Sequence, residues 1–115
     1  MKLAVIGSRS FNNFELLNDE IQTLDFEITD IISGGAKGAD ALAEKWAIQN
    51  NIALTIIKPI WNKFGRGAGI KRNNEIIQKC DYCIAFWDGK SKGTFSSIKF
   101  CEKYSKPHKI VLTKN

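Results

Sequence analysis

Two glycine-rich segments carry the residues best suited to chemistry. One runs from Ser33 to Asp40 and reads Ser-Gly-Gly-Ala-Lys-Gly-Ala-Asp, and the other runs from Asp88 to Thr94 and reads Asp-Gly-Lys-Ser-Lys-Gly-Thr. Each follows an apolar, strand-like run and precedes a helix-like run. Glycine lets the backbone approach a ligand closely, and the first turn of a helix offers unpaired N–H groups and a positive dipole end to an anion. Together the segments predict one shared phosphate site.

The elements that must position these segments alternate between strand and helix periodicity. Short apolar runs predict strands at residues 2–7, 28–32, 53–57, 82–87 and 109–112. Helical spacing predicts helices over residues 14–24, 39–47 and 68–79. A last helix is expected after Thr94, which is predicted to be its N-cap, and Pro107 ends it.

Strands joined by helical segments of ten or more residues require crossover connections, and these favour a parallel sheet. The sequence therefore predicts a single α/β domain over residues 1–115, a three-layer Rossmann-like fold. Its sheet is expected to be five-stranded and mainly parallel, with helices on both faces. Ligands bind such sheets outside the carboxyl ends of the strands. Gly7-Ser8-Arg9, the two glycine segments, and Pro59 with the loop containing Trp61 and Phe64 all follow predicted strands and should converge there.

The net charge of +5 is unevenly distributed. Residues 1–57 carry four Lys/Arg against eight Asp/Glu, whereas residues 58–115 carry thirteen against four. This excess is consistent with an anionic small molecule or with nucleic acid, and equally with lysines that keep a small protein in solution.

The chain shows no apolar run of eighteen residues, and its first run stops at Gly7. We therefore expect a cytoplasmic protein with no membrane partner. Three cysteines do not predict a disulfide framework. Cys80 and Cys83 have no second pair, so no metal site is predicted, and the lone His108 is expected to be structural.

General nucleotide fingerprints do not fit. A P-loop requires Gly-Lys-Ser/Thr, but Ala39 follows Gly38, and the dinucleotide pattern requires three glycines after the first strand, where Gly7 stands alone. A Walker ATPase and a simple NAD dehydrogenase are therefore not expected.

Taken in order, four segments resemble the SLOG superfamily, in its YspA-like, cpYpsA-related branch. They are Ile6–Arg9, Ser33–Asp40, Gly69–Asn73 and Phe86–Gly89 with Gly93-Thr94. The resemblance implies a nucleotide or an ADP-ribose-like or NAD-like ligand, bound by a sensor or binding module that requires no cofactor. It also implies a homodimer.

The superfamily includes the LOG nucleotide phosphoribohydrolases, which suggest an N-glycosidase as an alternative. Arg72 matches the LOG arginine and Gly93-Thr94 matches the phosphate-binding pair, but Ser97 stands where LOG enzymes have a glutamate. Serine cannot replace a carboxylate in glycosidic bond cleavage. Catalytic candidates are therefore Arg72 and the carboxylates of Asp40, Glu75 and Asp88.

The DNA-processing protein DprA is a second comparison. Arg72-Asn73-Asn74-Glu75-Ile76-Ile77 is similar to its Arg-Asn-Arg-Ile-Ile stretch, which suggests single-stranded DNA as another ligand, with Trp61 and Phe64 as stacking residues or only as a cover for the sheet edge.

Arg72 is expected to hold phosphate, while Asp40 is expected either to bind a ribose hydroxyl or to stabilise its helix terminus. The glycines are expected either to let the backbone approach the ligand closely or only to permit tight packing of strand and helix. The full predicted ligand-binding set is Gly7, Ser8, Arg9, Gly34, Gly35, Lys37, Gly38, Asp40, Arg72, Asn73, Asp88, Gly89, Gly93 and Thr94.

Overall fold

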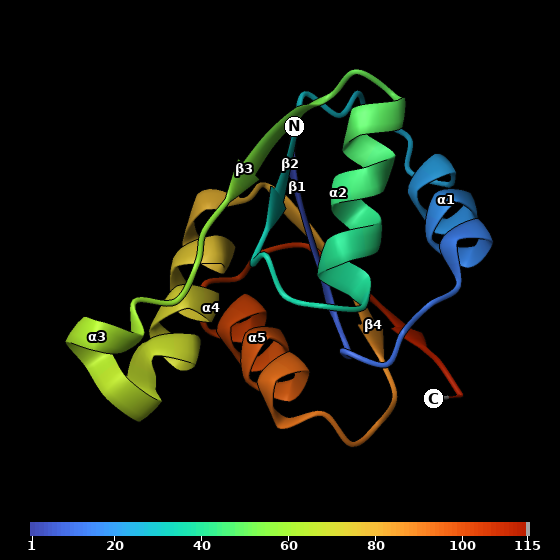
Figure 1. Ribbon diagram of the computed structural model, residues 1–115. Coiled ribbons are helices and arrows are strands. Elements are labelled where there is room, and N and C mark those ends of the chain that lie inside the picture. The colour runs from blue at the N-terminus through green and yellow to red at the C-terminus, as the bar shows by residue number, and fades with distance from the viewer. Residues whose placement is uncertain (115) are drawn as a thin grey trace.

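Five parallel strands form the centre of the computed structural model, which describes residues 1–114 (Figure 1). Their order in the sheet is β3-β2-β1-β4-β5, and all four neighbouring pairs are parallel. The strands are β1 (Lys2–Gly7), β2 (Asp30–Ser33), β3 (Ala53–Ile56), β4 (Tyr82–Trp87) and β5 (His108–Leu112). The predicted five-stranded α/β fold is confirmed, and every pairing in the sheet is parallel.

Helices cover both faces of the sheet (Figure 1). They are α1 (Phe14–Gln22), α2 (Ala39–Gln49), α3 (Trp61–Phe64), the 3-10 turn η1 (Gly65–Gly67), α4 (Ala68–Lys79) and α5 (Lys92–Lys103). The α3 segment, predicted as a loop, is a short helix that stands away from the body at the left of Figure 1. In the part of the chain that the structure describes, no helix is both long and apolar enough to cross a bilayer.

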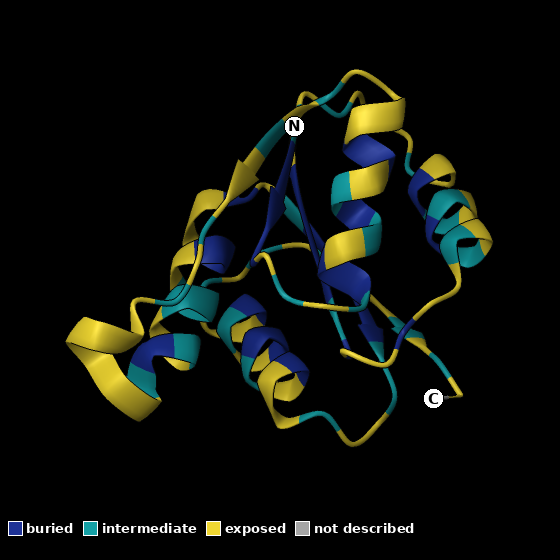
Figure 2. Ribbon diagram, in the orientation of Figure 1, coloured by how far each residue is buried: buried dark blue, intermediate teal, exposed yellow. Residues whose placement is uncertain are grey.

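Each face of the sheet has its own hydrophobic core, because side chains alternate along a strand. Leu3 and Val5 of β1 pack with α1 and α2, whereas Ala4 and Ile6 pack with α4 and α5. Figure 2 shows the central strands as dark blue bands between the helices. The three cysteines, Cys80, Cys83 and Cys101, are buried in the second core.

The order of the strands places a switch point beside β1. The chain moves from β1 to β2 and β3 on one side, and then crosses to β4 and β5 on the other. Helices leaving β1 and β4 therefore diverge, and a crevice opens at the carboxyl ends of these strands. The segments that follow β1 and β4, which begin at Ser8 and Asp88, both contain residues predicted to bind a ligand.

Candidate functional site

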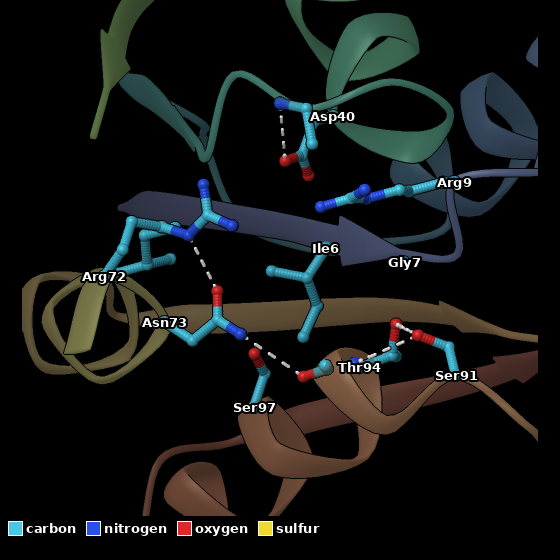
Figure 3. Close-up of a pocket in the computed structure, with 12 residues that line it drawn as sticks. Ile6, Gly7, Arg9, Asp40, Arg72, Asn73, Ser91, Thr94 and Ser97 are labelled. Carbon is cyan, nitrogen blue, oxygen red and sulfur yellow. Dashed lines mark hydrogen bonds between the residues drawn. The ribbon is translucent and has the colours of Figure 1, made fainter. Parts of the chain in front are cut away.

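A small cavity lies at this switch point (Figure 3). Its volume is about 100 Å³, which suits a phosphate-sized group better than a whole nucleotide. We call it the inner cavity. Its lining comes from β1 and its following loop, the first glycine segment, α2, α4 and α5, namely Ile6, Gly7, Arg9, Ala36, Asp40, Arg72, Asn73, Ile76, Ser91, Gly93, Thr94 and Ser97.

A larger cavity of about 620 Å³ adjoins the inner one, and we call it the outer cavity. Arg9, Ala36 and Arg72 line both. The rest of the outer lining is Gly34, Gly35, Lys37, Lys58, Pro59 and Trp61. Loops that follow β1, β2, β3 and β4 thus meet at one edge of the sheet, as a parallel sheet requires.

Arg72 joins the two glycine segments. Its Nη1 donates to the carbonyl of Gly34, and its Nε donates to Asn73 Oδ1 at 2.8 Å. Asn73 Nδ2 in turn donates to the carbonyl of Gly93 at 3.3 Å. Burial lowers the pKa of Arg72, the carboxyl of Asp40 acts against this, and the charge of Arg9 adds to it. An arginine remains charged despite such a shift, so a fixed cation stands between the two segments.

Asp40 is a nearly buried carboxyl in the first turn of α2, with 7% of its surface exposed. Its Oδ2 accepts a hydrogen bond from the N–H of Ala36 at 3.1 Å. Burial raises the pKa of Asp40 above its ordinary value, although the Ala36 N–H and Arg72 act in the opposite direction. The side chain can therefore hold a proton more readily than a surface aspartate, or accept a hydrogen bond from a ligand hydroxyl.

Arg9 is exposed and makes no hydrogen bond or ion pair with any residue between 1 and 114. Its guanidinium extends toward the space between Asp40 and Arg72 (Figure 3). Two guanidinium groups that face one small cavity repel each other, and an anion between them removes that repulsion. This pair gives the inner cavity the chemistry of an anion site.

The second glycine segment forms the N-terminus of α5. The N-cap of α5 is Ser91, whose Oγ accepts a hydrogen bond from the N–H of Thr94 at 3.3 Å. The prediction that Thr94 is the N-cap was therefore wrong. Asp88 Oδ1 accepts from the N–H groups of Lys90 and Ser91, both at 2.8 Å. The N–H groups of Lys92 and Gly93 have no acceptor in the described chain, and so they can serve an anion.

The structure separates the predicted ligand-binding residues into three groups. Seven line the inner cavity: Gly7, Arg9, Asp40, Arg72, Asn73, Gly93 and Thr94. Three line only the outer cavity: Gly34, Gly35 and Lys37. Four line neither and shape the loops around them: Ser8, Gly38, Asp88 and Gly89.

Among the catalytic candidates, only Asp40 and Arg72 line the inner cavity. Glu75 lies in a third cavity of about 240 Å³ together with Phe64, and its carboxylate pairs with Lys79 at 3.3 Å. Asp88 is engaged by backbone N–H groups of its own loop. Ser97, at the position of the LOG glutamate, lines the inner cavity and is buried.

Several lining residues were missed by the sequence reasoning. Lys58 lies two residues after the end of β3, so the rule that selected the other loops should have included it. Ala36 lies inside the first glycine segment but is not in the predicted ligand-binding set, and its side chain has no polar group. Ile6 and Ile76 carry no signal, since apolar residues with these spacings are indistinguishable from ordinary core residues.

Known proteins resemble this chain in sequence and in fold. A profile of the YspA, cpYpsA-related SLOG family matches residues 1–64. The Gene 61 protein of Mycobacterium phage D29 is 28% identical over 116 residues, which cover 92% of each chain. The matched profile includes the first glycine segment, while Arg72 and the second segment lie beyond it.

Two solved structures of DNA processing protein A (DprA) share the fold, each at 23% identity. The Streptococcus pneumoniae protein gives a TM-score of 0.78 over 95% of this chain and 49% of its own. The Helicobacter pylori protein gives a TM-score of 0.72 over 96% of this chain and 64% of its own. This chain therefore spans between about half and two thirds of the length of these structures.

Proposed function

The chain belongs to the YspA, cpYpsA-related SLOG family, and on that premise we propose that it binds a nucleotide or a nucleotide-derived anion, such as an ADP-ribose-like or NAD-like molecule. It acts as a binding module or sensor. In this proposal a phosphate group occupies the inner cavity, and the ribose and base extend into the outer cavity.

The observation that carries the proposal is the pair of guanidinium groups, Arg9 and Arg72, that line one phosphate-sized cavity at the N-terminus of a helix. Arg72 is held by its bonds to Gly34 and Asn73, so its position costs little ordering on binding. Arg9 has no such bonds and is available to close on the ligand. Bidentate pairing with phosphate is the interaction for which arginine is best suited.

The outer cavity has the features of a base and ribose subsite. Lys37 and Lys58 add positive charge for a second phosphate, and Trp61, which is 53% exposed, offers a flat apolar surface on which a base can stack. Asp40 is the acidic side chain of the inner cavity, where its carboxyl can accept a hydrogen bond from a ribose hydroxyl.

A thermal-shift screen tests the proposal. The ligands are nucleoside mono-, di- and triphosphates, ADP-ribose, NAD and its cyclic derivatives, and every mixture that shifts is analysed by chromatography. A ligand at a hundred times its dissociation constant adds about 2.7 kcal/mol to the free energy of unfolding. Recovery of intact ligand supports a binding module, and recovery of free base establishes an N-glycosidase.

Two arginine variants and a control locate the binding site. Arg9→Ala removes no intramolecular bond, so the fold should be unaffected while affinity falls about tenfold or more, because a hydrogen bond to a charged group contributes about 1.5–3 kcal/mol. Arg72→Ala should weaken binding at least as much. Lys79→Ala removes an equally charged residue from the exposed pair with Glu75 and should leave affinity unchanged. Binding that is insensitive to both arginines shows that the site is elsewhere.

Single-stranded nucleic acid is a second candidate, favoured by the segment around α3. Residues 58–72 carry five basic residues and no acidic ones, together with two exposed aromatic residues, Trp61 and Phe64. Residues 60–66 of this segment are all exposed, and α3 is yellow in Figure 2. The Helicobacter pylori DprA structure concerns single-stranded DNA binding by that protein.

Aromatic residues between cations are typical of surfaces that stack successive bases and follow a phosphate backbone. Fluorescence anisotropy with an oligothymidylate distinguishes the two candidates. A steep fall of affinity with salt and a loss of binding in Trp61→Ala support nucleic acid as the ligand. If the oligothymidylate does not bind, the nucleotide remains the favoured ligand.

A further inference from the structure

The outer edge of β5 is a second feature that lies outside the proposed ligand site. β5 is an edge strand, because it pairs only with β4. The N–H of Cys83 donates to Pro107 O at 3.1 Å, and the N–H of Thr113 donates to Trp87 O at 2.8 Å. Backbone groups alternate sides along a strand, so the N–H and C=O groups of His108, Ile110 and Leu112 face away from β4. They have no backbone partner within residues 1–114.

An apolar strip runs beside this free edge. In the sheet register Leu112 lies next to Trp87 and Ile110 next to Ala85, and both neighbours belong to the core under α4 and α5. Leu112 is 71% exposed and Ile110 is 42% exposed. Phe95 of α5, itself exposed, stacks on Trp87 with ring centroids 5.7 Å apart. Apolar side chains and free backbone groups thus occur on the same edge.

The surroundings of the strip are basic. Residues 88–114 contain seven lysines and two acidic residues, Asp88 and Glu102. Among the described residues, Lys99 pairs with Glu102 and Lys109 pairs with Glu20, and the other five lysines form no ion pair. Lys99 Nζ lies over the ring of Phe95, 5.3 Å from its centroid. A second copy of this chain paired edge to edge would bring like charges together, which disfavours self-association. Nucleic acid would satisfy the charge, but it cannot pair with a strand edge and gains little from aliphatic side chains.

We propose that the β5 edge binds an extended protein segment that carries acidic and apolar residues, and that this segment adds to the sheet as a further strand. Its backbone would pair with His108, Ile110 and Leu112, while its apolar side chains would cover the strip formed by Trp87, Phe95, Ile110 and Leu112. Its carboxylates would face the lysines. Main-chain pairing provides affinity in this mode of recognition, and the flanking side chains provide specificity.

Titration of the isotope-labelled protein with synthetic octapeptides tests this inference by NMR. The probe alternates valine with glutamate, and the comparison peptides alternate valine with lysine and glycine with glutamate. We expect only the valine–glutamate peptide to shift the amide signals of residues 108–113 and to slow the hydrogen exchange of Ile110 and Leu112. Leu112→Lys should weaken binding at least tenfold.

Ile48→Lys is the matched control, since Ile48 on α2 is 70% exposed and lies outside the strip. It should leave the affinity unchanged. Ile110→Pro removes an outward N–H without removing a bond to β4, because proline is tolerated on the free side of an edge strand. This variant should also lose the peptide, and it keeps the inference testable if Leu112→Lys fails to fold.

Three results would overturn the inference. One is the absence of any shift at millimolar valine–glutamate peptide, and another is equal binding of the valine–lysine peptide. The third is a homodimer in sedimentation experiments that Leu112→Lys dissociates, because the occupant of the edge is then a second copy of this chain.

Discussion

The two glycine segments occupy equivalent places in the fold, each between a parallel strand and the helix that follows it, but different forces hold them. The first is crowded. A Cβ at Gly34 would lie 2.6 Å from Arg72 Nη1, and one at Gly38 would lie 2.4 Å from the carbonyl oxygen of Ser8. The second is open, because a Cβ at Gly93 would meet only Asn73 Nδ2, at 3.9 Å. A similar pattern of glycines therefore serves packing in one segment and leaves room for a ligand in the other.

The aspartates of the two segments differ in the same way. Asp40 is nearly buried beside Arg72, and burial raises its pKa. Asp88 accepts hydrogen bonds from the backbone of its own exposed loop, first from Ser91 and then from Lys90, and these bonds lower its pKa. Asp40 thus lies in a buried tertiary environment beside Arg72 of α4, whereas Asp88 is held mainly by hydrogen bonds within its own loop. The predictions below test this distinction, beginning with the largest expected effect.

Gly38→Ala should destabilise the protein by about 2 kcal/mol or more. Gly38 has φ +77°, which a residue with a Cβ rarely adopts, and the added carbon would overlap the carbonyls of Ser8 and Arg9. Urea denaturation followed by circular dichroism measures the change. A free energy of unfolding within about 0.5 kcal/mol of wild type, the range of ordinary surface substitutions, would show that the first segment has room to relax.

The fold could be predicted from the sequence because its signals are local. A strand run, a glycine and an amphipathic helix recur along the chain, and each unit is complete within about 30 residues, as in other parallel α/β proteins. The network of the site is not local. Arg72 lies 38 residues from the carbonyl of Gly34 that it contacts, and Asn73 lies 20 residues from Gly93. Sequence spacing alone could not show which glycines this network crowds.

The helix cap shows a different limit. Ser91 and Thr94 are both good N-cap residues, and they lie three positions apart in the same segment. Asp88 settles the choice by accepting the N–H groups of Lys90 and Ser91, which turns the chain into α5 at Ser91. That arrangement requires the positive φ of Gly89, which is +80°. The N-cap preference of a single residue does not include this cooperation between Asp88, Gly89 and Ser91, so it could not identify the cap.

Asp40→Asn should raise the melting temperature at neutral pH. A carboxyl whose pKa is raised by folding destabilises the native state at pH values above that raised pKa, and the cost disappears as the pH falls below its ordinary value of 3.8. The advantage of the variant should therefore shrink on acidification. Asparagine can still accept the N–H of Ala36, so the fold is kept. A variant less stable than wild type at neutral pH would mean that the attraction to Arg72 outweighs the cost of burial.

The same variant should bind phosphate-bearing ligands more tightly, because Arg9 and Arg72 then face the anion without the carboxylate of Asp40, which lines the same cavity. Isothermal titration with the best ligand of the thermal-shift screen measures this change. Weaker binding would instead indicate that Asp40 contacts the ligand directly, as a ribose hydroxyl acceptor does.

Gly93→Ala separates the ligand from the fold in the second segment. Alanine is favoured over glycine within a helix by about 0.5–1 kcal/mol, so stability should be unchanged or slightly higher. Affinity for the phosphate ligand should fall, because a methyl group would enter the inner cavity. Gly69→Ala is the matched control: Gly69 is likewise the second residue of its helix, and it does not line that cavity. Equal affinity in both variants would exclude a close approach of the ligand to Gly93.

Asp88→Asn should have the smallest effect and the opposite dependence on pH from Asp40→Asn. A carboxyl whose pKa is lowered by folding stabilises the native state above its ordinary value of 3.8, and this stabilisation is lost as the pH falls through the lowered pKa. Wild type should therefore be slightly more stable than the variant at neutral pH and equal to it in strong acid. Melting temperatures of both variants across the same pH series measure the contrast. The melting temperatures of the two variants, each taken relative to wild type, should change in opposite directions with pH. If they change in the same direction, local hydrogen bonds do not set the pKa of Asp88, and the two aspartates do not differ in the way proposed.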